Sequence, residues 1–197
     1  MEKRLTEVVH ECLAEVVRPG EVAIDATTGN GRDTVVLARL VGSGGQVFGF
    51  DVQAEAIERT RQALAAAGCA RQVTLYRQGH EGMRAALSKI GPGTVAAVVF
   101  NLGFLPGGDK VCCTTAETTQ RALAQAWALL RPEGLLSVLC YTGHPGGREE
   151  TEGVRAWVAE LPKTAAEVAW HLPEGPVTNP PELLLVRKRT GCAAEKT

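Results

Sequence analysis

The chain has 197 residues, the length of one ordinary domain, and a formal net charge of −1 at pH 7. Hydrophobic residues make up 45% of it and charged residues 22%, which excludes a disordered chain and a strongly basic RNA-coating protein. No apolar stretch reaches the roughly 18 to 20 residues of a membrane span, so no membrane partner is expected. The six cysteines show neither a C-x-x-C pair nor zinc spacing, and the N-terminus is unlike a signal peptide. These features predict a cytoplasmic protein with reduced thiols and no metal.

Apolar runs alternate with segments of helical periodicity, which is typical of βα units around a mostly parallel sheet. In chain order we predict helix 2–17, strand 22–26, helix 33–40, strand 46–51, helix 54–67, strand 73–77, helix 82–88, strand 95–101, helix 117–130, strand 135–141, helix 149–161 and strands 167–171 and 183–187. The last two strands are too close in sequence for a parallel crossover, so a C-terminal antiparallel strand is expected. The prediction is an α/β, Rossmann-like domain over residues 1–189, with seven strands, helices on both faces and a flexible tail over 190–197.

A glycine-rich turn separates the first predicted strand from its helix, which is the context that a nucleotide-binding loop requires. It reads Asp-Ala-Thr-Thr-Gly-Asn-Gly-Arg-Asp-Thr over residues 25–34. Gly29 and Gly31 would let the backbone turn tightly and approach a ligand, at which the helix N-terminus would point its free N–H groups. Asp51 ends the second strand, where a carboxylate can bind ribose hydroxyls.

The type of nucleotide follows from what this turn lacks. A dinucleotide-binding loop needs a third glycine, and Thr34 stands there instead. S-adenosylmethionine carries no phosphate, and its cationic sulfonium suits the acidic Asp25 at the end of the first strand. We therefore favour S-adenosylmethionine over NAD, with a turn that binds no ligand as the alternative. After the third strand, His80 and Glu81 would contact this cofactor, or only cap and begin the next helix.

A long polar loop leaves the carboxyl end of the fourth strand, where open α/β sheets bind their ligands. Asn101 and Phe104 have the N-x-x-aromatic spacing of methyltransferases that act on amino groups. The amide oxygen of Asn101 can hold an amine N–H so that the lone pair faces the methyl group. Phe104 can stack on a planar base or plug the core, and Lys110 can contact phosphate or stay solvated.

A second glycine-rich loop follows the fifth strand at the same edge of the sheet. Tyr141 can stack on the acceptor, and His144 can accept a proton or bind the substrate. A tight loop with a polar histidine is the alternative. Arg148, which follows this loop, is a candidate contact for RNA, as is Lys110.

Three segments together resemble a family of small bacterial proteins labelled rRNA methylases, which includes the tRNA 5-aminomethyl-2-thiouridine methyltransferase of Gram-positive bacteria. The segments are residues 25–34, Phe-Asn-Leu-Gly-Phe-Leu-Pro-Gly-Gly-Asp-Lys at 100–110, and Tyr-Thr-Gly-His-Pro-Gly-Gly at 141–147. The resemblance extends over nearly the whole chain, to about residue 188. It implies a class I methyltransferase fold and S-adenosylmethionine as the cofactor.

The resemblance also implies roles for individual residues. It implies cofactor contacts at Asn30, Asp33, Asp51, Gln53 and His80. It implies methylation of the exocyclic amine of 5-aminomethyl-(2-thio)uridine at the tRNA wobble position, with the anticodon stem-loop as partner. In relatives the position of Phe104 is commonly tyrosine, so the stacking face is kept here and the hydroxyl is lost.

The complete prediction for the site combines both lines of reasoning. Catalytic roles are predicted for Asn101, Phe104, Tyr141 and His144. Cofactor contacts are predicted for Asp25, Thr28, Gly29, Asn30, Gly31, Asp33, Thr34, Asp51, Gln53, His80, Glu81 and Asn101, and RNA contacts for Lys110 and Arg148. The alternatives are an rRNA methyltransferase, a methyltransferase for a small-molecule amine, a sensor that binds the cofactor without turnover, and an NAD-dependent oxidoreductase. A homodimer is left open.

Overall fold

The helices and strands that the sequence predicts are all present in the computed structural model, which describes residues 3–105, 107, 113–173, 175 and 178–191. The strands are β1 (Val22–Asp25), β2 (Gln46–Asp51), β3 (Val73–Arg77), β4 (Val95–Leu102), β5 (Leu130–Cys140), β6 (Ala166–His171) and β7 (Glu182–Lys188). The α-helices are α1 (Leu5–Val16), α2 (Arg32–Val41), α3 (Ala54–Ala66), α4 (Met83–Ala86), α5 (Ala116–Leu129) and α6 (Gly147–Ala159). Short 3-10 turns lie at Ala70–Gln72 and His80–Gly82.

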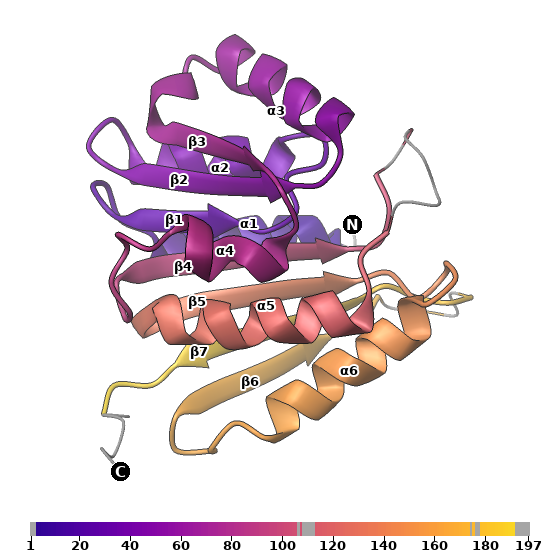
Figure 1. The fold of residues 1–197 in the computed structure, drawn as a ribbon. Coiled ribbons are helices and arrows are strands. Elements are labelled where there is room, and N and C mark those ends of the chain that lie inside the picture. Colours follow the sequence, from indigo (N-terminus) through magenta and orange to yellow (C-terminus); the bar gives the residue numbers. More distant parts are fainter. Residues whose placement is uncertain (1–2, 106, 108–112, 174, 176–177, 192–197) are drawn as a thin grey trace.

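One seven-stranded sheet runs through the molecule in the order β3-β2-β1-β4-β5-β7-β6 (Figure 1). The pairs from β3 across to β5 are parallel, whereas β7 is antiparallel to both β5 and β6. Helices α1, α2 and α3 pack on one face, and α4, α5 and α6 pack on the other. The predicted Rossmann-like fold, with its antiparallel C-terminal strand, is confirmed.

The start of β5 differs from the prediction, which placed it five residues later than Leu130. Leu130 pairs with Val95 and Leu135 pairs with Ala97, so the residues between the two leucines bulge out of the ladder. Within this bulge Glu133 has a positive φ of 59°. The prediction was wrong here because the Pro-Glu-Gly sequence of the bulge is typical of a turn.

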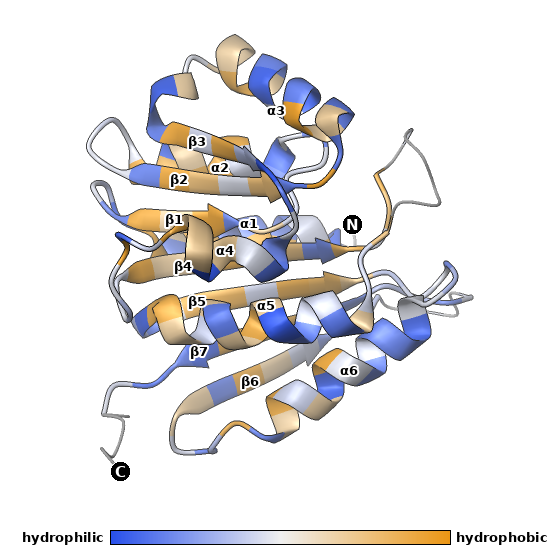
Figure 2. Ribbon diagram, viewed as in Figure 1, coloured by the Kyte–Doolittle hydropathy of each residue, from blue (hydrophilic) through white to orange (hydrophobic). Residues whose placement is uncertain are grey.

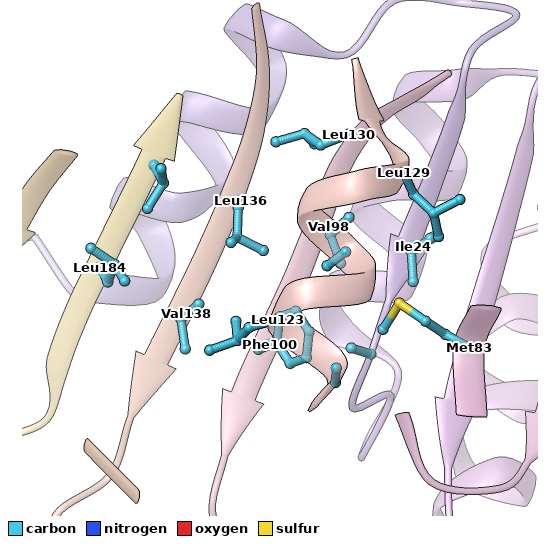
Figure 3. Packing of buried hydrophobic residues seen from close by; sticks show 14 of the residues in the cluster. Ile24, Met83, Val98, Phe100, Leu123, Leu129, Leu130, Leu136, Val138 and Leu184 are labelled. Carbon is cyan, nitrogen blue, oxygen red and sulfur yellow. The ribbon is translucent and has the colours of Figure 1, made fainter. Parts of the chain in front are cut away.

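The core consists of two apolar layers, one on each face of the sheet. In β4, Val98 and Phe100 face one layer while Ala97 and Val99 face the other, as the two-residue period of a strand requires. Figure 2 shows the consequence, since the central strands are apolar along most of their length and the helices are polar on their outer sides. The layer that contains Val98 and Phe100 is called the first apolar layer below. In it, Leu123 of α5 packs over the sheet among the side chains drawn in Figure 3.

A buried carboxyl group ties the end of β1 to α2. Asp25 is 0% exposed, and its Oδ2 accepts the Thr34 hydroxyl at 2.5 Å while its Oδ1 accepts the Thr27 N–H at 3.2 Å. Burial, and after it the negative charge of Asp33, raises the pKa of Asp25 from 3.8 to about 7. A substantial fraction of this carboxyl therefore carries a proton at neutral pH.

The C-terminal end is described only up to Gly191, and residues 192–197 of the predicted tail lie outside the described residues. Thr190 donates its hydroxyl to Glu133 Oε1 at 2.7 Å. No helix within the described ranges has the length and apolar character needed to cross a membrane. The predicted domain boundary at residue 189 stays a prediction.

Truncation of Leu123 tests the importance of the first apolar layer. Leu123 is 0% exposed, so Leu123→Ala is expected to lower the free energy of unfolding by about 2–5 kcal/mol through lost burial and the cavity left behind. The matched control is Leu172→Ala, because Leu172 is 56% exposed and its loss should change stability by about 0.5 kcal/mol or less. Urea denaturation measures both, and equal losses would contradict the assignment.

The buried carboxyl of Asp25 predicts a pH dependence of stability. Because its pKa in the folded state lies above that of the unfolded chain, its contribution to stability is lost as the pH rises through about 7. Asp25→Asn retains an acceptor for the Thr27 N–H but has no charge to bury. The melting temperature of the variant minus that of the wild type should therefore rise between pH 5 and pH 8. A constant difference across this range in thermal unfolding would rule the explanation out.

Candidate functional site

A pocket of about 200 Å³ opens at the carboxyl ends of the parallel strands. It lies beside the junction of β1 and β4, where the strand order changes direction and open α/β sheets bind their ligands. Its walls are the loops that follow β1 to β4 and the start of α5. Among the predicted site residues, the lining includes Gly29, Asp51, Gln53, His80, Glu81, Asn101 and Phe104.

The glycine turn adopts the left-handed backbone that its sequence predicts, with φ of 51° at Gly29 and 78° at Gly31. Only Gly29 lines the pocket. A Cβ on Gly31 would stand 2.9 Å from the Cα of Thr60 in α3, so Gly31 allows a close approach to a helix. The interpretation that both glycines make room for a ligand therefore applies to Gly29, and Gly31 instead packs the turn against α3.

Asp51 joins this turn to the end of β2. Its Oδ2 accepts the Gly29 N–H at 3.0 Å, and its Oδ1 accepts the Gln53 N–H at 3.0 Å. Burial raises the pKa of Asp51, and backbone hydrogen bonds from Gln53, Gly29 and Val52 oppose this shift. A carboxylate has about four acceptor sites, so Asp51 can hold the turn and still accept a ligand hydroxyl.

Several predicted cofactor residues lie beneath or beside the turn instead of on the pocket surface. Asp25 and Thr34 are 0% exposed and bonded to each other. Thr28 is also buried and donates its backbone N–H to the Phe50 carbonyl at 3.0 Å. Asn30 accepts from the Arg59 guanidinium of α3 at 3.0 Å. In this arrangement these four residues hold the shape of the turn.

The loop after β3 places two predicted residues in the pocket wall. His80 is 5% exposed, and its ring meets the ring of Phe100 edge to face at 5.5 Å. Burial lowers the pKa of His80, and a backbone hydrogen bond to Ala26 opposes this shift, so the neutral imidazole prevails at pH 7. Glu81 is held by Gln125 of α5, which donates to the Glu81 carbonyl at 2.6 Å.

Asn101, at the end of β4, is fixed through both its backbone and its side chain. Its N–H donates to the Thr27 hydroxyl at 2.7 Å, and its Nδ2 donates to Asp33 Oδ2 at 2.5 Å. No described residue donates to its Oδ1, and Asn101 lines the pocket. The site therefore presents one fixed amide oxygen beside the glycine turn.

The base of the loop after β4 is closed by a buried acid from α6. Thr114 donates to Glu150 Oε2 at 2.7 Å and accepts the Gly103 N–H at 2.9 Å, while Thr119 donates to Glu150 Oε1 at 2.5 Å. Phe104 pairs with Cys113 just beyond this point. Burial raises the pKa of Glu150, which is 1% exposed. Through Thr114 and Thr119, Glu150 thus clamps the loop that carries Phe104 to the first turn of α5.

Tyr141 and His144 lie near the pocket but do not line it. Tyr141 is 43% exposed in a neighbouring groove of about 780 Å³, whose lining also includes Lys3, Arg4 and His171. The ring of His144 meets the ring of Phe104 edge to face at 6.0 Å, and its Nδ1 donates to the Pro145 carbonyl at 2.9 Å.

The other nitrogen of His144, Nε2, is buried without a hydrogen-bond partner among the described residues. A Cβ on Gly147 would stand 2.9 Å from it, so this nitrogen faces backbone. In this position His144 supports Phe104, and its predicted part in proton transfer stays a prediction.

Of the two predicted RNA contacts, Arg148 lies within the described residues. Lys110 lies outside the described residues. Arg148 donates to the Asn179 side chain at 2.7 Å, on the border of a third groove near β7. Their predicted contacts with RNA stay predictions.

Sequence reasoning missed several residues that hold the site in place. His10 of α1 bonds to Asp33 at 2.5 Å although 23 residues separate them, and a lone histidine on an amphipathic helix gives no signal of this contact. Thr27, whose hydroxyl accepts the Asn101 N–H, is absent from the predicted site residues although most of its loop neighbours are among them. Glu150 reads from sequence as an acid in the first turn of a helix, which is common for reasons of the helix dipole alone.

Comparison with known proteins places the chain among methyltransferases. A family model described as "Putative rRNA methylase" matches residues 47–187. A protein of Arabidopsis thaliana named tRNA (mnm(5)s(2)U34)-methyltransferase, chloroplastic, is 42% identical over 170 residues, which are 81% of this chain and 61% of the plant protein. The chain therefore spans less than two thirds of the length of that relative.

Two solved bacterial structures match over nearly their whole length. One, described as a "putative rRNA-methylase" from Clostridium thermocellum, is 37% identical with a TM-score of 0.88 and covers 95% of this chain and 99% of its own. The other, described as a "putative methyltransferase" from Streptococcus mutans in complex with SAH, is 33% identical with a TM-score of 0.83 and the same coverage. The extent of these matches shows that the chain belongs to the family described as "Putative rRNA methylase".

Proposed function

We propose that this protein is an S-adenosylmethionine-dependent methyltransferase that methylates the exocyclic amine of 5-aminomethyl-(2-thio)uridine at the wobble position of tRNA. One observation carries the proposal. The amide oxygen of Asn101 is fixed and unpaired among the described residues, in the same pocket as the Asp51 carboxylate and the glycine turn. The plant relative bears the name of a methyltransferase for that nucleoside.

The pocket suits S-adenosylmethionine in both shape and charge. The Asp51 carboxylate would accept the ribose hydroxyls, with the bare backbone of Gly29 beside it. The neutral His80 would lie at the edge of the adenine, which is an uncharged base and offers no ionic partner to a charged ring. The Streptococcus mutans relative holds SAH, the product that this cofactor leaves after methyl transfer.

The reaction would need alignment more than it needs a reactive side chain. When bound, the cofactor supplies a methyl group on a sulfonium, which is already an activated leaving group. The residues of this chain would then have to hold the amine in line with that methyl group. Asn101 Oδ1 would accept an N–H of the amine and so direct the lone pair, while Phe104 would stack on the base.

An RNA acceptor has to reach this pocket despite the near-zero net charge of the chain. The groove beside Tyr141 offers Lys3, Arg4 and His171, which are the side-chain types that bind phosphates. Tyr141 would stack on a neighbouring base there. The predicted cytoplasmic location stays a prediction and a homodimer stays open, and the plant relative is named as chloroplastic.

A direct assay distinguishes the tRNA proposal from its alternatives. The purified protein is incubated with methyl-labelled S-adenosylmethionine and tRNA that carries the unmethylated aminomethyl-uridine, and the nucleosides are analysed by mass spectrometry. We expect the methylaminomethyl nucleoside to appear with the wild type and to fall roughly 100-fold with Asn101→Ala. Labelling of rRNA alone, or of small amines alone, would overturn the tRNA proposal in favour of that acceptor.

Substitution of Asp51 tests the cofactor site separately from the acceptor. Asp51→Asn removes the charge from hydrogen bonds to the ribose, so the Kd for SAH is expected to rise roughly 10- to 100-fold. The matched control is Glu58→Gln, because the side chain of Glu58 is 53% exposed on α3 and far from any role in the proposal. Titration calorimetry measures both variants, and equal Kd values for wild type and Asp51→Asn would contradict the assignment.

A further inference from the structure

A continuous chain of hydrogen bonds links helix α1 to the acceptor side of the pocket. His10 Nε2 lies 2.5 Å from Asp33 Oδ1, and the other oxygen of Asp33 accepts from Asn101 Nδ2 at 2.5 Å. Asn101 is held in addition by the bond from its N–H to Thr27. Three elements that are distant in sequence, α1, the first turn of α2 and the end of β4, thus meet at one carboxylate.

Asp33 is largely enclosed by other side chains. Its side chain is only 12% exposed, and that of His10 is 32% exposed. The hydrogen bond to Asp33 raises the pKa of His10, which burial opposes. Burial, and after it the negative charge of Asp33, raises the pKa of Asp25 and of Tyr141. His10 donates its Nε2–H to Oδ1 of Asp33.

The carboxylate allows only one orientation of the Asn101 amide. With Nδ2 toward Asp33, the amide donates a hydrogen bond to a charged acceptor at 2.5 Å. In the reverse orientation two oxygens would meet at that distance, which is repulsive. The orientation that Asp33 selects is also the one that leaves Oδ1, on a residue that lines the pocket, as an acceptor to which no described residue donates.

We propose that His10 and Asp33 are positioning residues, in which His10 holds the Asp33 carboxylate and Asp33 locks the Asn101 amide with its oxygen toward the acceptor amine. This inference rests on the proposed function and assigns Asp33 a task other than the cofactor contact that the family resemblance implies. Neither side chain needs to touch the transferred methyl group. Their effect would reach the reaction through the orientation of a single amide.

Kinetics of His10 variants test the proposal. His10→Ala removes the donor, so kcat for transfer to tRNA should fall roughly 10- to 100-fold while KM for tRNA and the Kd for SAH change by about twofold or less. His10→Gln should recover most of kcat, because the amide nitrogen of glutamine reaches about as far as Nε2 and can donate to Asp33. The matched control is Glu15→Ala, since the Glu15 side chain is 72% exposed on the same helix.

A spectroscopic measurement tests the same inference without any assay of activity. The chain contains three asparagines, Asn30, Asn101 and Asn179, so asparagine-selective 15N labelling gives few side-chain signals. The Asn101 pair is identified by its loss in Asn101→Asp. We expect that pair to move in His10→Ala, to stay near its wild-type position in His10→Gln and to be unchanged in Glu15→Ala.

The outcomes separate failure of this inference from failure of the proposed function. If the wild type methylates no tRNA but the Asn101 signals respond to His10 as expected, the bonding chain stands and only the acceptor is wrong. If the wild type is active and His10→Ala keeps its kcat, or if glutamine restores no more than alanine, the positioning role is overturned. Unmoved Asn101 signals in His10→Ala overturn it as well.

Discussion

The hydrogen bond between the Gly29 N–H and the Asp51 carboxylate is the interaction on which the geometry of the pocket depends. It joins the loop after β1 to the end of the neighbouring strand, and the same carboxylate receives the N–H of Gln53 as the chain turns toward α3. Together with the bond from the Thr28 N–H to the Phe50 carbonyl, it fixes the glycine turn against the end of β2. The buried Asp25 below and α3 beside the turn only reinforce a position that Asp51 sets.

Most of the fold could be predicted because apolar periodicity and turn residues agree along most of the chain. The bounds of β2 and β3 match their predicted ranges, since each is a short apolar run between clear breaks. The start of β5 could not be predicted, because Leu130 belongs to the sheet only through a bulge that carries turn residues. The predicted helix 82–88 is shorter in the structure, where a 3-10 turn ends at Gly82 and α4 covers the four residues Met83–Ala86. The local sequence gives no cue for this shortening.

The sequence predicts those residues of the candidate site that lie at the ends of strands, but not those that helices bring to it. Asp51 and Asn101 end predicted strands and His80 follows one, so the topology alone brings them to one edge. The contacts of His10 and Glu150 arise from helices that pack across the fold, and nothing local in the sequence marks them. Burial also changed the interpretation of Asp25, whose acidic character suggested a ligand contact although its carboxyl lies under the turn.

The reversal of strand order between β1 and β4 divides the chain into two stretches with separate tasks. Residues up to Glu81 would form the nucleoside side of the pocket, and everything from Asn101 onward would form the side that selects the acceptor. The clamp made by Glu150 lies wholly within the second stretch. Evolution could therefore exchange one half of such a gene for that of a relative and obtain a new substrate range, while the machinery for the common methyl donor is inherited intact.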